Sequence, residues 1–185
     1  MQEHQGAQDW KAKSGGGAKI GDFRDAAVFG QILLNCTQGA ITLDALRSID
    51  RKHLAGKLLI DVANPLDFSR GNPPTLTICN TDSLGESIQR EFTEAKVVKA
   101  FNTVNCQVMV DPGRVKGEHD IFICGNDSES KNAVKELLRD FGWKSIIDLG
   151  DITNARATEQ LMPIWIRLWT QFGTADFINF KIVRN

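Results

Sequence analysis

The chain has 185 residues and a mass of 20.5 kDa, with 42% apolar residues, 24% charged residues and a formal net charge of −1. Acids and bases are interleaved, so the sequence lacks the broad basic field that favours nucleic acid or an anionic membrane. It also lacks the ~20-residue apolar run that spans a bilayer, and its polar N-terminus has no apolar signal core. We expect one cytoplasmic domain that binds neither nucleic acid nor membrane.

The four cysteines are scattered and form no C-x-x-C pair. Three of them end apolar runs, which predicts buried free thiols rather than zinc ligands or disulfides. This use of cysteine is typical of a reducing compartment. The residues are Cys36, Cys79, Cys106 and Cys124.

In chain order, residues 1–17 are predicted to be a flexible segment. Asp22 can cap a first helix that Gly30 ends, and apolar spacing indicates a second helix over 41–49. Short apolar runs between these helices indicate strands, and 66–75 is rich in Gly, Pro and Ser, which is typical of a loop. The N-terminal half is predicted to contain strands over 18–20, 31–36 and 57–63, and helices over 22–30 and 41–49.

In the second half, Ser83 and Glu86 have the spacing of a capping box. The helix over 127–142 has the clearest apolar face, and Gly142 closes it. Pro163 predicts a bend in the last helix. This half is predicted to contain helices over 83–92, 127–142 and 153–172, and strands over 96–101, 119–125 and 144–150.

Strands that are apolar on both faces alternate with helices along the chain. This pattern indicates a mostly parallel sheet covered on both sides, which is a doubly wound, Rossmann-like α/β fold. We expect this domain over 18–150 and a C-terminal helix and tail over 151–185.

The stretch "SGGGAKIGDF" at 14–23 looks at first like a glycine loop that binds phosphate. Such a loop must follow a strand and open a helix, so that backbone N–H groups point at the phosphates. Here the preceding residues are polar, and the predicted strand comes after the glycines. We therefore interpret 14–23 as a flexible entry loop.

Three strand exits change abruptly from apolar residues to amides and hydroxyls: "NCTQGA" at 35–40, "VANPLD" at 62–67 and "AFNTVN" at 100–105. Ligands of open parallel sheets lie beyond the carboxyl ends of the strands. Uncharged groups of this kind suit a carboxamide, a ribose or a flat heterocycle, although at any single exit they can simply make turns. The polar residues are Asn35, Thr37, Asn64, Asn102, Thr103 and Asn105.

Two other features have structural explanations. Asp61 lies inside the apolar run "LLIDVAN", where a carboxylate must be hydrogen-bonded, and we expect it to bind backbone or hydroxyl groups. The apolar stripe of the last helix, which includes Trp165 and Trp169, is expected to pack in the core or in a dimer interface. The alternative, which we favour less, is a lid over a flat substrate.

Several segments resemble the NADP oxidoreductases related to deazaflavin (coenzyme F420)-dependent NADP reductase, and more distantly the reductase domains of six-transmembrane metalloreductases. The similarity runs from about Lys19 to the end, and "KAFNTVN" is its most specific part. The segments are "GDFRDAA", "GKLLIDVANPLDFSRG", "NTDSLGE", "VVKAFNTVN", "DIFICGNDSESKNAVKELLRDFGW" and "DLGDITNARATEQLMPIW".

The resemblance implies a Rossmann domain that binds NADP(H) and transfers hydride to or from a deazaflavin or another small redox compound. It implies no metal and no acid–base pair among the side chains, because the nicotinamide carries the chemistry. It places the nicotinamide side of the cofactor site at Cys36, Thr37, Ala63, Asn64, Pro65, Phe101, Asn102 and Thr103.

The sequence departs from the family in one respect, because the family's opening strand, G-x-G-x-x-G turn, helix and second strand are missing from it. Three explanations stay open: a truncated chain, which we favour, a natural remnant, or a partner that supplies these strands. We expect weak or absent NADP binding by the chain as given, and self-association through an unpaired strand edge. The alternative function is a non-catalytic Rossmann-like remnant that acts through protein contacts.

Overall fold

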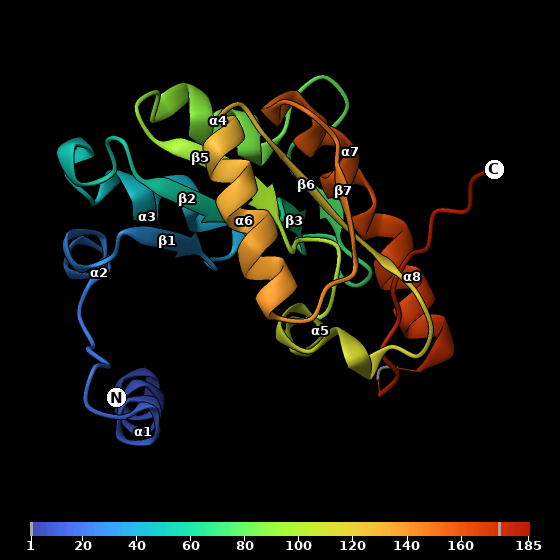
Figure 1. Ribbon diagram of the computed structural model, residues 1–185, viewed down its shortest axis with the longest axis horizontal. Coiled ribbons are helices and arrows are strands. Elements are labelled where there is room, and N and C mark those ends of the chain that lie inside the picture. The colour runs from blue at the N-terminus through green and yellow to red at the C-terminus, as the bar shows by residue number, and fades with distance from the viewer. Residues whose placement is uncertain (1, 174) are drawn as a thin grey trace.

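The computed structural model describes residues 2–173 and 175–185, and its centre is a five-stranded sheet in the order β1-β2-β5-β6-β7 (Figure 1). Strands β1, β2 and β5 are parallel, β6 is antiparallel to β5, and β7 is parallel to β6. This mostly parallel sheet confirms the Rossmann-like fold class. The strands are β1 (Ile32–Asn35), β2 (Leu58–Asp61), β5 (Lys96–Ala100), β6 (Asp120–Gly125) and β7 (Ser145–Asp148).

Helices cover both faces of the sheet because successive side chains of a strand point to opposite sides. Leu59 and Val97 pack on the face covered by α2, α3, α4 and α7, and Ile60 and Val98 pack on the face covered by α5 and α6. Figure 1 shows α6 lying across the second face. These helices are α2 (Phe23–Phe29), α3 (Thr42–Arg47), α4 (Leu84–Glu91), α5 (Cys106–Val110), α6 (Ser128–Asp140) and α7 (Ala155–Gln160).

The helix starts follow the capping residues of the sequence. Asp22 caps α2 and forms a full capping box with Asp25, and Asp127 caps α6 by accepting from Ser130 N–H. Ser83 caps α4, but Glu86 does not complete the predicted box. Its carboxylate instead accepts from the Ser83 hydroxyl and pairs with Arg156.

Four elements of the N-terminal half differ from the sequence-based expectation. Residues 18–20 form no strand, so β1 is the edge of the sheet and pairs only with β2. The prediction that 31–36 is a buried strand is therefore wrong, because Ile32 is 48% and Leu34 52% exposed. The 66–75 loop contains most of a small antiparallel hairpin, which pairs β3 (Leu66–Asp67) with β4 (Thr75–Leu76).

The N-terminal segment that we expect to be flexible contains a helix, α1 (Gln2–Ser14). Figure 1 shows α1 lying apart from the sheet, beyond the residues that lead to α2. Gly15 begins this connection with a positive φ of 83°, a conformation that favours glycine.

The last predicted helix is broken into α7 and α8 (Met162–Phe172), with Pro163 in the first turn of α8 as the bend requires. Trp165 stacks on Trp169 with ring centroids 5.8 Å apart, and both pack near the hairpin residues Leu66 and Leu76. The tryptophan stripe therefore packs in the core of this chain. Short 3-10 turns complete the fold: η1 (Gly39–Ile41), η2 (Arg51–His53), η3 (Pro112–Arg114) and η4 (Ile152–Asn154).

The cysteines are free, as predicted, but most are not buried. Cys124 lies inside β6 and is fully buried, whereas Cys36, Cys79 and Cys106 are exposed. The reason is positional: Cys36 and Cys79 lie in the turns after β1 and β4, and Cys106 begins α5, so none of the three lies inside a strand.

Candidate functional site

The parallel register aligns the ends of three neighbouring strands. Asn35 of β1 lies beside Asp61 of β2, and Asp61 lies beside Lys99 of β5. The residues that follow these positions therefore leave the sheet at one edge. This edge carries all eight residues that the resemblance assigns to the nicotinamide side: Cys36, Thr37, Ala63, Asn64, Pro65, Phe101, Asn102 and Thr103.

Two of these residues form a reciprocal pair. Asn102 Nδ2 donates to Asn64 Oδ1 at 3.0 Å, and Asn64 Nδ2 donates to the Asn102 carbonyl oxygen at 2.8 Å. Asn102 is only 3% exposed, yet its Oδ1 accepts no hydrogen bond from the described residues. A buried amide oxygen without a partner is costly, which makes this atom a candidate acceptor for a donor that the described residues do not supply.

The backbone beside Asn102 is strained. Phe101 has a φ of 65°, which is rare for a bulky residue, and its side chain is buried against Phe141. Such conformations persist where the surrounding structure enforces them, and they cluster at functional sites.

The exit of β1 packs tightly on the exit of β2. A Cβ atom on Gly39 would lie 2.0 Å from the Asn64 carbonyl oxygen, so only glycine fits there. Thr37 is half-buried, and its hydroxyl bonds Asn35 Oδ1 at 2.7 Å and Thr42 Oγ1 at 2.8 Å. Cys36 completes this exit and is exposed as a residue, but the protein atoms around its sulfur, together with the Asp61 carboxylate, raise the pKa of its thiol. The shift favours the neutral thiol over the thiolate.

The remaining polar residues of the three exits have structural roles. Asn35 is buried and donates to Asp61, and Asn105 caps α5 by accepting from Gln107 N–H. Thr103 is buried beside Asn102. For Asn35 and Asn105 the turn and capping interpretation holds.

A buried ion cluster lies directly behind these exits and was only partly foreseen. Asp61 is hydrogen-bonded, as predicted, but its main partner is Lys99, which also contacts Glu159 of α7. Burial acts to lower the pKa of Lys99, but the two carboxylates outweigh it and hold the pKa above its usual value. Burial raises the pKa of Glu159. The signal in the sequence was a lysine inside the apolar run "VVKAF", one strand away from Asp61.

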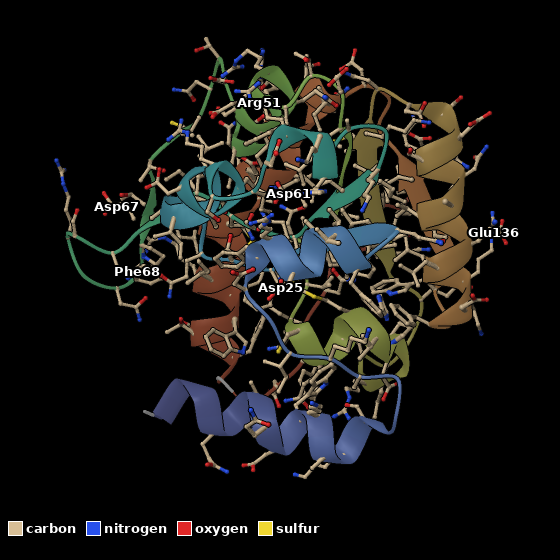
Figure 2. All side chains as sticks on the ribbon, turned by 90° about the vertical axis from the view of Figure 1, so that its left-hand side faces the viewer. Asp25, Arg51, Asp61, Asp67, Phe68 and Glu136 are labelled. Atoms are coloured by element: carbon tan, nitrogen blue, oxygen red, sulfur yellow. The ribbon has the colours of Figure 1, made fainter. Side chains whose placement is uncertain are left out.

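A groove of about 1100 Å³ runs along the exposed edge of the sheet. Its walls are mostly apolar side chains of β1, α2 and α3, and Trp10 of α1 lies at its border. Figure 2 views the molecule from this side, with α2 in front of the sheet, Asp25 on α2 and Asp61 in the interior. The groove reaches Asn35 and Thr37, so it adjoins the strand exits.

Two kinds of site are not found in the described part of the chain. Among residues 5–173 and 175–185, whose side chains the structure describes, no group of His, Cys, Asp and Glu could hold a metal ion. Over the same residues, every helix is too short or too polar to cross a bilayer.

Known proteins match this chain over most of its length. The F420-dependent NADP reductase of Methanocaldococcus jannaschii is 30% identical over 146 residues, which are 78% of this chain and 65% of the reductase. The crystal structure of a proposed F420-dependent NADP reductase from Arthrobacter sp. FB24 is 55% identical, with a TM-score of 0.85 over 88% of this chain and 74% of that one. The chain belongs to the NADP oxidoreductase family related to F420-dependent NADP reductase.

Membership of this family rests on the similarity to these proteins over most of the chain, since no model of a protein family matches. The metalloreductase STEAP3 of Rattus norvegicus is 33% identical over 116 residues, which are 60% of this chain and 22% of that protein. The chain thus spans just under two thirds of the Methanocaldococcus reductase and about a fifth of the metalloreductase. The resemblance to metalloreductases is confirmed as a similarity of sequence over a smaller part of the chain.

Proposed function

We propose that this chain takes part in hydride transfer between NADP(H) and a small redox compound, and that the nicotinamide binds at the carboxyl edge of β1, β2 and β5. The observation that carries the proposal is the buried, unpartnered Oδ1 of Asn102 beside the strained Phe101. The relatives named as F420-dependent NADP reductases support NADP as the cofactor and a deazaflavin as the redox partner.

The chemistry of the edge suits a nicotinamide. Its carboxamide N–H₂ group can donate to Asn102 Oδ1, which is otherwise left unsatisfied. Ala63, Pro65 and Phe101 at the same strand exits are buried, so the surroundings of this edge are largely apolar. When bound, the nicotinamide supplies the hydride, and the protein's task is to hold the ring in a fixed orientation.

The phosphate half of the cofactor has no comparable cradle in the described residues. The glycines at 15–17 follow helix α1 rather than a strand, and no helix begins directly after them. Their N–H groups are therefore not arranged as in a phosphate-binding loop between a strand and a helix. Contacts to the pyrophosphate and the 2′-phosphate supply much of the affinity for NADP. We therefore propose that these 185 residues bind NADP(H) weakly.

The edge of the sheet favours association of chains. Val62 N–H donates to the Asn35 carbonyl oxygen, so the backbone of Asn35 faces β2, and by alternation the N–H and C=O groups of Leu34 face outward. An exposed, uncharged edge strand is a template for pairing with another strand. We propose that the protein is a homo-oligomer on this basis.

The exposed edge strand β1 also supports a second candidate function, in which the chain is a Rossmann-like module that acts through protein contacts. The specific observation is the apolar groove beside β1, which joins the exposed side chains of Phe23, Val28 and Phe29. Exposed apolar surface of this extent is typical of interaction sites.

Isothermal titration with NADPH separates the two functions. We expect the wild-type chain to bind NADPH with a dissociation constant above about 1 μM, because the phosphate contacts are missing. Binding should be lost in Asn102→Leu and retained in the matched amide variant Asn105→Ala, whose asparagine caps α5. Equal binding by both variants would show that the nicotinamide does not bind at the carboxyl ends of β1, β2 and β5. No heat at millimolar NADPH, with self-association intact, would favour the contact module.

A further inference from the structure

One buried lysine links β5 to the exit of β2 from inside the protein. Lys99 of β5 is 0% exposed, and its Nζ lies 2.7 Å from Asp61 Oδ2 and 2.8 Å from Glu159 Oε1. It also donates to the carbonyl oxygen of Ala63, which leads out of β2. A buried lysine with three oxygen partners is fully hydrogen-bonded.

Asp61 extends the network to the neighbouring exits. Its Oδ1 accepts from Asn35 Nδ2 at 2.7 Å and from the backbone N–H of Ala63 at 3.2 Å. Ala63 is thus held at both of its backbone groups, the N–H by Asp61 and the carbonyl by Lys99. The next residue is Asn64, whose side chain pairs with Asn102.

Glu159 anchors the opposite side of the cluster. Its carboxylate accepts from the backbone N–H groups of Leu84 at 2.9 Å and Gly85 at 3.1 Å, in the first turn of α4. A carboxylate is stabilised at a helix N-terminus. Glu159 therefore ties Lys99 to the helical layer rather than to the strand exits.

We propose that Asp61 and Lys99 are positioning residues for the nicotinamide edge. They fix the Ala63 backbone, which sets the Asn64 side chain, which in turn orients the Asn102 amide so that its Oδ1 stays free. The identity of the ligand rests on the proposed function, but the positioning is a property of the chain alone.

The cost of the cluster supports this role. Removing ions from water is expensive, and well-packed apolar residues stabilise a core at least as well as a buried ion pair. Directional hydrogen bonds do what apolar packing cannot, because they fix the Ala63 backbone in one orientation. The charges lie directly behind the strand exits, where orientation matters for a ligand.

Asp61→Asn and Glu159→Gln form a matched pair that tests the proposal. Each removes one negative partner of Lys99 and is nearly isosteric, but only Asp61 contacts Ala63. The readout is the solvent protection of the Asn64 and Asn102 side-chain amides, measured by NMR on the ¹⁵N-labelled full chain without cofactor. We expect Asp61→Asn to lower this protection about tenfold and Glu159→Gln to leave it nearly unchanged.

Equal loss of protection in both variants, or unchanged protection in a folded Asp61→Asn chain, would overturn the proposal. Should Asp61→Asn fail to fold, Asn35→Ser replaces it, because it removes the donor that orients Asp61 Oδ1. We then expect a smaller loss of solvent protection at the same two side-chain amides, and unchanged protection would again contradict the positioning role.

Adding NADPH to the same samples keeps the two hypotheses distinct. If the two variants differ as expected but NADPH leaves the Asn102 amide of the wild type unchanged, the positioning holds and the proposed function fails. If NADPH protects that amide equally in wild type and Asp61→Asn, the proposed function holds and the positioning fails.

Discussion

Asn102 and Asn64 hold each other through two hydrogen bonds between the exits of neighbouring strands, 38 residues apart in the sequence. Within this pair the Asn102 side chain uses its Nδ2 as a donor, and its Oδ1 has no hydrogen-bond partner among the described residues. Asn102 Oδ1 is therefore a fixed acceptor to which no described residue donates a hydrogen bond.

Asn102→Leu removes both the free acceptor and the bond to Asn64 Oδ1. We expect a loss of about 1–3 kcal/mol in the free energy of unfolding, because Asn64 is left with an unsatisfied oxygen. Urea unfolding measures this loss, and NADPH titration measures the loss of binding. Asn105→Ala should cost about 1 kcal/mol through its helix cap while leaving binding intact. Unchanged binding by Asn102→Leu would contradict the role of this residue.

Gly39→Ala tests the contact between the exits of β1 and β2. Its Cβ would clash with the Asn64 carbonyl oxygen, so the backbone at 64–65 must shift. We expect destabilisation by about 1–3 kcal/mol. Gly16→Ala is the control, since a Cβ there meets no neighbour within 4 Å. Equal melting temperatures for the two variants would show that the two exits do not depend on this close approach.

Asp120 makes the stability of the C-terminal tail depend on pH. Burial acts to raise the pKa of Asp120, but hydrogen bonds from Ile182 N–H and the Ser145 hydroxyl, together with Lys181, outweigh it and hold the pKa below its usual value. A depressed carboxylate pKa contributes stability that is present above the unfolded value of about 3.9 and is lost as pH falls through the folded value.

Urea unfolding between pH 5 and pH 2.5 measures this contribution. We expect the free energy of unfolding of the wild type to fall as the pH is lowered. The Asp120→Asn variant should be less stable than the wild type at pH 5, and its free energy of unfolding should change less below pH 5. Asp140→Asn, at an exposed carboxylate at the C-terminal end of α6, should leave the slope nearly unchanged. Parallel acid profiles for wild type and Asp120→Asn would contradict the assignment.

Leu34→Lys tests pairing through the edge of β1. A lysine on an edge strand opposes pairing with another strand, so the variant should be monomeric at concentrations where the wild type associates. Val110→Lys is matched to it, because Val110 is similarly exposed but lies on α5. Light scattering at increasing concentration gives the result. A wild type that stays monomeric at high concentration would rule out association through this edge.

The sequence predicted well what depends on local patterns. Apolar runs located all five strands of the sheet, and Asp22, Ser83 and Asp127 marked the starts of their helices. It failed for β1, where an apolar run lies at the edge of the sheet, because burial depends on which strands are neighbours and not on the run itself.

The clustering of the candidate residues at one edge could be predicted from the sequence, whereas the contacts that hold them could not. Amides and hydroxyls after three strands pointed to one edge, and the structure places those residues together there. The free oxygen of Asn102 and the contact between Lys99 and Glu159 could not be foreseen, because they depend on side-chain directions and on residues 60 positions apart. Likewise, only the backbone shows that Phe101 is strained.

The most direct test of the central claim is an NMR titration of the ¹⁵N-labelled chain with NADPH. We expect weak, saturable shifts that include the Asn102 side-chain amide and the backbone at 36–37, 63–65 and 101–103, and that disappear in Asn102→Leu. Saturable shifts confined to the groove along β1 and α2, with the Asn102 amide unmoved at millimolar NADPH, would contradict binding of the nicotinamide at the strand exits.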